Sequence, residues 1–145
     1  RGIPLISLML RGNGHCLVKR SGSPSQAMHA LDQFAGRVKD NNWIPVIFPE
    51  GTRSVDGNLG TFHAAGFRRF LDRAPMPVAV CAIDGGWRVG TLKGIRQHMR
   101  SGSYRVKVLK IYAAPTSKAE QVAILEEGKT LIEAQLVEWR SAETR

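Results

Sequence analysis

The chain has 145 residues, of which 43% are hydrophobic and 23% charged, a composition typical of one globular domain that excludes a disordered chain. Its formal net charge of +9 favours polyanionic partners, namely nucleic acid, anionic lipid surfaces or phosphorylated substrates. No stretch approaches the roughly 20 apolar residues that a membrane-spanning helix needs. The two cysteines, Cys16 and Cys81, have no partner at metal-ligand spacing, so we expect buried thiols and no metal site.

The N-terminal third of the chain combines an ambiguous start with a clear helix signal. Residues 1–10 are mostly apolar and fit a helix or a strand equally well. Because Arg1 stands where an initiating Met is expected, we expect the chain to be part of a longer protein. Residues 15–20 predict a short strand that ends in two cations. Ser23 as N-cap, followed by a proline and by apolar residues at helical spacing, predicts a helix over residues 24–39.

The remainder of the chain alternates between strand and helix patterns. Residues 43–48 form a short apolar, β-branched run that predicts a buried strand. Residues 78–83 form a continuous apolar run that predicts a strand covered on both faces. Residues 104–112 alternate between polar and apolar side chains and predict a half-exposed strand near a sheet edge, where its cations discourage pairing. Helices are predicted over residues 62–72 and 118–140. This alternation predicts a single α/β domain.

The loop after the first of these apolar runs holds the residues best suited to binding an anion. It reads Phe-Pro-Glu-Gly-Thr-Arg-Ser over residues 48–54 and leads into an Asp-Gly turn. Arg53 offers a planar guanidinium that suits phosphate or carboxylate. Glu50 can hold that guanidinium or bind a substrate hydroxyl, Thr52 can add a hydrogen bond, and Gly51 permits a tight turn or close backbone approach. A plain strand-to-loop exit with a surface salt bridge would have the same composition.

This string resembles, at all seven positions, the third signature block of the glycerolipid acyltransferase family, the PlsC-like lysophospholipid and glycerol-phosphate acyltransferases. Residues 14–20 resemble the family's second block, which ends in an arginine, here Arg20, although Lys19 stands where an acidic residue is common. Residues 76–83 fit the looser fourth block. The resemblance covers residues 2–86 and implies a mixed, mostly parallel sheet flanked by helices, here N-terminally incomplete.

The family's first block, His-x-x-x-x-Asp, is absent from this sequence. The residues five positions after His15, His29, His63 and His98 are Arg20, Phe34, Arg68 and Ser103. His29 and Asp32 lie three apart on the predicted helix, and we interpret them as a surface pair. The resemblance assigns the general base to the missing histidine. Residues 1–145 are therefore predicted to be a partial acyltransferase domain that holds no catalytic residue and is nearly inactive alone.

The resemblance also implies a reaction and its substrates. An acyl group would pass from acyl-CoA or acyl-carrier protein to the hydroxyl of a lysophospholipid such as 1-acyl-glycerol-3-phosphate, in phospholipid biosynthesis and without a metal or redox cofactor. Arg20 and Arg53 would hold the acceptor phosphate. Glu50, Gly51 and Thr52 would complete the substrate-binding loop. We expect such an enzyme at the cytoplasmic face of a membrane, on anionic lipid, held peripherally or through segments outside this chain.

Two alternatives belong to other functional classes. One is a non-catalytic phosphate- or lipid-binding module of the same fold, which would keep the anion site without the base. The other is a basic nucleic-acid-binding domain. No helix-turn-helix, zinc or RNA-binding signature supports the latter, so we expect no nucleic-acid partner. Acyl chain length, acyl donor, head group and oligomeric state follow from none of these patterns.

Overall fold

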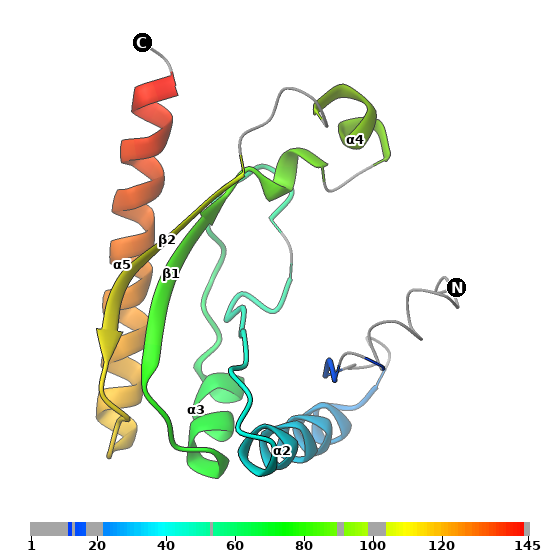
Figure 1. The fold of residues 1–145 in the computed structure, drawn as a ribbon, viewed down its shortest axis with the longest axis vertical. Helices are drawn as coiled ribbons and strands as arrows, with labels where there is room; N and C mark the ends of the chain where they lie inside the picture. Colours follow the sequence, from blue (N-terminus) through cyan, green and yellow to red (C-terminus); the bar gives the residue numbers. More distant parts are fainter. Residues whose placement is uncertain are drawn as a thin grey trace. The chain divides into compact units, whose positions relative to one another are not determined.

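The computed structural model describes residues 12, 14–16, 22–52, 54–89, 92–98 and 104–143 (Figure 1). The chain divides into two compact units. The first comprises residues 1–47 and 65–75, and the second comprises residues 48–64 and 76–145.

The first unit is built on two helices, α2 (Pro24–Asp40) and α3 (Ala64–Arg73). Ser23 caps α2, because its Oγ accepts the N–H of Gln26 at 3.3 Å and a proline fills the first helical position. The helix predicted over residues 24–39 is therefore confirmed. The helix predicted to begin at residue 62 is also present, and it begins two residues later.

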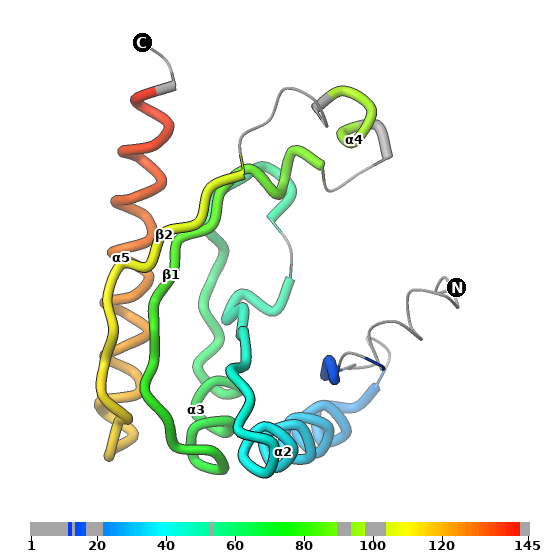
Figure 2. The backbone as a smooth tube through the Cα atoms, viewed as in Figure 1, coloured from blue at the N-terminus to red at the C-terminus, as the bar shows by residue number. Residues whose placement is uncertain are grey.

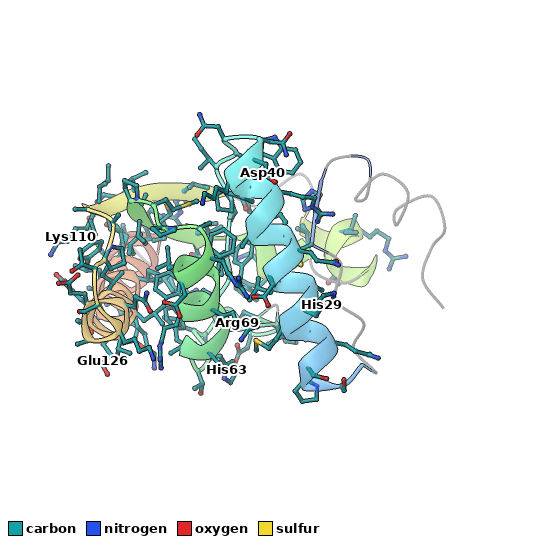
Figure 3. All side chains as sticks on the ribbon, turned by 90° about the horizontal axis from the view of Figure 1, so that it is seen from below. His29, Asp40, His63, Arg69, Lys110 and Glu126 are labelled. Carbon is teal, nitrogen blue, oxygen red and sulfur yellow. The ribbon has the colours of Figure 1, made fainter. Side chains whose placement is uncertain are left out.

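Aromatic and charged contacts join α2 to α3. The rings of Phe34 and Phe70 have centroids 5.9 Å apart. The guanidinium of Arg69, a residue labelled in Figure 3, donates to both carboxylate oxygens of Asp32, with its Nε at 2.8 Å and its Nη2 at 2.5 Å. The buried apolar residues of the two helices are Ala35, Val38, Phe67, Phe70 and Leu71. The helix pair thus has an apolar interior and a bidentate ion pair at its surface.

The second unit contains a two-stranded antiparallel sheet and a long helix. Strand β1 (Val78–Asp84) pairs with β2 (Arg105–Tyr112). The 3₁₀ helix η1 (Gly86–Val89) and the helix α4 (Leu92–His98) lie between them in the chain. Helix α5 (Lys118–Glu143) follows β2 and packs against the sheet. The predicted strands at residues 78–83 and 104–112 and the predicted helix at residues 118–140 are present. The prediction that residues 78–83 are covered on both faces is wrong, because Ala79 is exposed and its neighbours Val78 and Val80 are only half-buried.

The lysines of β2 bond to side chains of α5, whereas the cations of this strand were expected to discourage pairing at a sheet edge. The Nζ of Lys107 donates to Gln135 Oε1 at 2.6 Å, and the Nζ of Lys110 donates to Glu127 Oε1 at 2.5 Å. Leu109 of β2 has no partner in β1, because Lys110 pairs with Val80 and Val108 pairs with the next residue, Cys81. This β-bulge keeps both lysines on the same face of the sheet. The alternation therefore predicted the strand correctly, but its cations hold a helix. The apolar residues of the opposite face are exposed, and they are Val106, Val108 and Ile111.

Two predictions about the sheet are not met in the described part of the chain. The sheet found there is antiparallel, whereas a mostly parallel sheet was predicted. Residues 43–48 form no strand, and Ile44 is 94% exposed. Figure 2 shows their backbone and that of the residues up to α3 as an irregular path. An apolar run becomes a strand only when a neighbouring strand completes its backbone hydrogen bonds, and neither β1 nor β2, the two strands of the described sheet, pairs with residues 43–48. Residues 17–20, most of the strand predicted over residues 15–20, lie outside the described residues.

Within the described ranges of the chain, no helix is both long enough and apolar enough to cross a bilayer. Residues 1–10, which the sequence leaves open between helix and strand, lie outside those ranges.

Candidate substrate-binding loop

The loop of residues 48–63 begins with a tight turn and closes on itself at its base. The N–H of Gly51 donates to the carbonyl of Phe48 at 3.1 Å, which forms a four-residue turn with Pro49 at the position that proline favours. The N–H of His63 donates to the carbonyl of Pro49 at 2.8 Å. The two ends of the loop are therefore held together by the backbone itself.

Glu50 joins the start of the loop, its first limb, to the residues that lead back toward His63, its second limb. Its Oε2 accepts the N–H of Gly60 at 2.6 Å. A Cβ atom on residue 60 would lie 2.9 Å from that same oxygen, so only glycine lets the carboxylate come this close. We predicted that Glu50 would hold a guanidinium or a substrate hydroxyl. The structure gives this carboxylate a backbone partner in its own loop.

Ser54 and Asp56 organise the tip of the loop. The Oγ of Ser54 accepts the N–H of Gly57 at 2.8 Å and lies 2.9 Å from the carbonyl oxygen of Asn58, to which it can donate. The Oδ1 of Asp56 accepts the N–H of Asn58 at 2.9 Å. The backbone N–H and the side-chain amide of Asn58 hold the pKa of Asp56 below its ordinary value. The tip is thus a turn closed by its own side chains.

Gly51 and Thr52 lie on the exposed part of the loop, between these two fastened regions. Gly51 has a φ of +67°, in the left-handed region that favours glycine. The ring of His63 lies in ordinary van der Waals range of a Cβ at this position, so backbone conformation rather than space calls for glycine. The structure therefore brings Glu50, Gly51 and Thr52 together in one loop, with Gly51 and Thr52 facing solvent.

The two arginines predicted to bind phosphate, Arg20 and Arg53, lie outside the described residues. Their convergence on one anion stays a prediction. We predicted that His29 and Asp32 would pair with each other at the surface, but each side chain bonds to a different residue. Asp32 accepts the fork of Arg69, and the Nε2 of His29 lies 3.0 Å from the side-chain amide nitrogen of Gln33. The planar guanidinium matches both carboxylate oxygens at once, which a single imidazole nitrogen cannot do.

Sequence reasoning missed a buried carboxylate, Asp84, whose partner Arg140 donates to the carbonyl of Gly57 at the tip of the loop. Asp84, the last residue of β1, is 4% exposed and accepts hydrogen bonds from Arg140 of α5 and from Trp87. Burial acts to raise the pKa of Asp84, but the Arg140 guanidinium and the N–H of Gly85 bring that pKa below its ordinary value. The Asp-Gly-Gly-Trp string at residues 84–87 was interpreted only as the end of a strand.

The side chains that the structure describes include no group of three or more His, Cys, Asp or Glu residues that could hold a metal ion.

Comparison with known proteins adds an independent line of evidence. A model of the family described as "Acyltransferase" matches residues 1–84. Proteins named 1-acyl-sn-glycerol-3-phosphate acyltransferase from Limnanthes alba and Limnanthes douglasii are each 29% identical over 93 residues, covering 62% of this chain and 32% of each relative. A protein of the same name from Cocos nucifera is 31% identical over 93 residues, covering 62% of this chain and 30% of that relative. The matched region thus spans about a third of these relatives' length. No solved structure gives a significant match.

Proposed function

The chain belongs to the acyltransferase family, and from that premise we propose that it forms the acceptor-binding part of an enzyme that acylates a lysophospholipid. The acyl donor is acyl-CoA or acyl-carrier protein, and the acceptor is 1-acyl-glycerol-3-phosphate or a close analogue. The curated relatives that it resembles carry the name of that reaction.

One observation carries this proposal: the complete signature over residues 48–54 sits in a loop that its own side chains hold closed. Glu50 and Ser54 bond to backbone groups of the same loop. Thr52 is exposed at its surface, next to Arg53 in the sequence. Such a loop can present the hydroxyl of Thr52 to a phosphate, and a guanidinium suits the same anion.

The reaction assigns each group one task. Arg53, with Arg20, binds the acceptor phosphate and so places the glycerol hydroxyl. A general base takes the proton of that hydroxyl, the oxygen attacks the thioester carbonyl, an ester forms, and the thiol of the donor leaves with a proton. The sequence of this chain contains no His-x-x-x-x-Asp block to supply the base. We therefore expect residues 1–145 alone to be slower than the whole enzyme by about 10² to 10⁴-fold.

A thiol-release assay on the whole gene product tests this function. The acceptor is 1-acyl-glycerol-3-phosphate in vesicles of phosphatidylglycerol or of phosphatidylcholine, and the donors are acyl-CoA and acyl-carrier protein. We expect thiol release that requires the acceptor and is faster on the anionic vesicles, because we also propose that the chain, with its net charge of +9, works at the cytoplasmic face of an anionic membrane. Residues 1–145 are assayed in parallel.

The same assay separates the enzyme from a non-catalytic module. That second candidate would keep the complete signature of residues 48–54 and have no His-x-x-x-x-Asp block in the whole gene product. Acceptor binding without thiol release by the whole gene product, with either donor, would establish the binding module. Full turnover by residues 1–145 alone would refute the assignment of the base to another segment.

A further inference from the structure

The tip of the signature loop is fastened to two elements that lie far from it in the sequence. The Nη2 of Arg140, in the last turn of α5, donates to the carbonyl of Gly57 at 2.6 Å and to Asp84 Oδ1 at 3.0 Å. The Nε1 of Trp87 donates to the same Asp84 oxygen at 3.3 Å. One guanidinium therefore joins the loop tip to the end of β1 and to α5.

Gly57 is the residue that lets these groups approach. Its φ of +84° lies in the left-handed region, and a Cβ on it would lie 2.7 Å from Nε1 of Trp87. Backbone conformation and space therefore both require glycine here. The indole of Trp87 lies against Gly57, the residue whose carbonyl oxygen accepts the hydrogen bond from Arg140.

We propose that Arg140 is a positioning residue that, together with Asp84 and Trp87, clamps the Gly57 turn and so holds the signature loop in its acceptor-binding conformation. Arg140 lies beyond residues 1–84, the part that matches the family model. The inference rests on the proposed function, because it concerns how that site is kept ready for its substrate.

A short series of contacts carries the constraint from Arg140 to the exposed part of the loop. Gly57, whose carbonyl Arg140 holds, donates its N–H to the Oγ of Ser54, the last signature residue. The opposite limb is fixed by the bond from the Gly60 N–H to Glu50. With both limbs held, Gly51 and Thr52 have fewer conformations to lose when a ligand binds.

The clamp requires a guanidinium at residue 140, whereas a simple ion pair between β1 and α5 would require only a positive charge. A lysine keeps a positive charge beside Asp84, but its single ammonium lacks the planar fork that reaches the carboxylate and the Gly57 carbonyl together. Arg140→Lys therefore removes the clamp while leaving the buried carboxylate with a cation. Arg105→Lys is the matched control, because Arg105 donates to the Trp139 carbonyl of the same end of α5 at 3.3 Å.

The experiment compares these two variants with the wild-type chain of 145 residues. Amide hydrogen exchange at Gly57 and Gly60 and the indole N–H resonance of Trp87 report the clamp without any ligand. Titration with a short-chain, monomeric 1-acyl-glycerol-3-phosphate reports the site. For Arg140→Lys we expect exchange at both glycines to be about 10-fold faster or more, a shifted Trp87 resonance and about 10-fold weaker binding. For Arg105→Lys we expect wild-type values of all three.

The exchange and binding measurements test separate claims. The proposed clamp is contradicted if Arg140→Lys leaves exchange and binding unchanged. It is also contradicted if Arg105→Lys changes them as much as Arg140→Lys does. If the wild-type chain fails to bind the acceptor, the proposed function fails, and the exchange rates still decide whether the clamp exists. Should Arg140→Lys fail to fold, Trp87→Phe removes the indole donor to Asp84 but keeps an aromatic ring, and wild-type exchange at Gly57 in that variant would overturn the proposal.

Discussion

Glu50 and Ser54 show that polar residues of a binding signature can serve the loop rather than the ligand. The carboxylate of Glu50 accepts the Gly60 N–H, and the hydroxyl of Ser54 accepts the Gly57 N–H. Two glycines outside the signature are therefore as necessary to its shape as the residues within it. We propose that Thr52 and Arg53 are the signature side chains that meet the substrate.

Gly60→Ala tests this division of roles at a single residue. The added methyl group would lie 2.9 Å from Glu50 Oε2 and would displace the carboxylate from the Gly60 N–H. We expect the free energy of unfolding to fall by about 1 to 2 kcal/mol, because a hydrogen bond to a charged group is lost, and acceptor binding to weaken. Chemical denaturation and acceptor titration measure the two effects.

Gly36→Ala is the control for Gly60→Ala. Gly36 lies inside α2, and a Cβ there would meet no atom within 4 Å. Alanine at this position should raise the free energy of unfolding by about 0.5 to 1 kcal/mol, since it favours the helix. Wild-type stability and binding in Gly60→Ala would show that the Glu50 contact does not shape the loop.

At the scale of elements, local sequence signals predicted helices better than strands. Helix α2 follows from Ser23 before it, and α5 also begins after a serine, Ser117, whose Oγ accepts the Glu120 N–H at 3.2 Å. Glu120 itself accepts the N–H of Thr116 at 2.6 Å, one residue earlier than a standard capping box requires. The residues that form a helix cap are only three or four positions apart, so a short stretch of sequence is nearly sufficient to predict the cap.

Strands and the candidate site depend on partners that are distant in the sequence. Residues 43–48 have an apolar, β-branched pattern, but no pattern within them specifies a neighbouring strand. The predicted loop with Glu50, Gly51 and Thr52 is present, whereas the bonds that fix it come from Gly60 and Arg140. Separations of 10 residues for Glu50–Gly60 and 83 for Gly57–Arg140 exceed what periodicity or motif spacing can reveal.

At the scale of the whole molecule, the carboxyl groups that the structure describes predict how stability changes in acid. Five of them have a pKa below its ordinary value, and they are Asp32, Asp56, Asp84, Glu120 and Glu127. The folded chain therefore binds fewer protons than the unfolded chain in acid. Their stabilising contribution is fully present above the unfolded pKa values of about 3.9 for Asp and 4.3 for Glu, and it is lost as the pH falls through the lower folded values.

We therefore expect the thermal unfolding midpoint to decline steeply below a pH of about 4. Circular dichroism melts from pH 7 to pH 3 measure this decline. Asp84→Asn should flatten part of it, because one of the depressed carboxyl groups has been removed. A midpoint that rises toward pH 3 would contradict the direction of these pKa shifts.

The most direct test of the central claim is whether residues 1–145 recognise the acceptor through its phosphate. The measurement is a calorimetric titration of the chain with short-chain, monomeric 1-acyl-glycerol-3-phosphate and with the monoacylglycerol of the same chain length. We predict that the phosphate-bearing ligand binds about 10- to 100-fold more tightly, since charge-assisted hydrogen bonds distinguish the two, and that Arg53→Gln abolishes the difference. Equal affinity for the two ligands, or a preference that survives Arg53→Gln, would contradict the account.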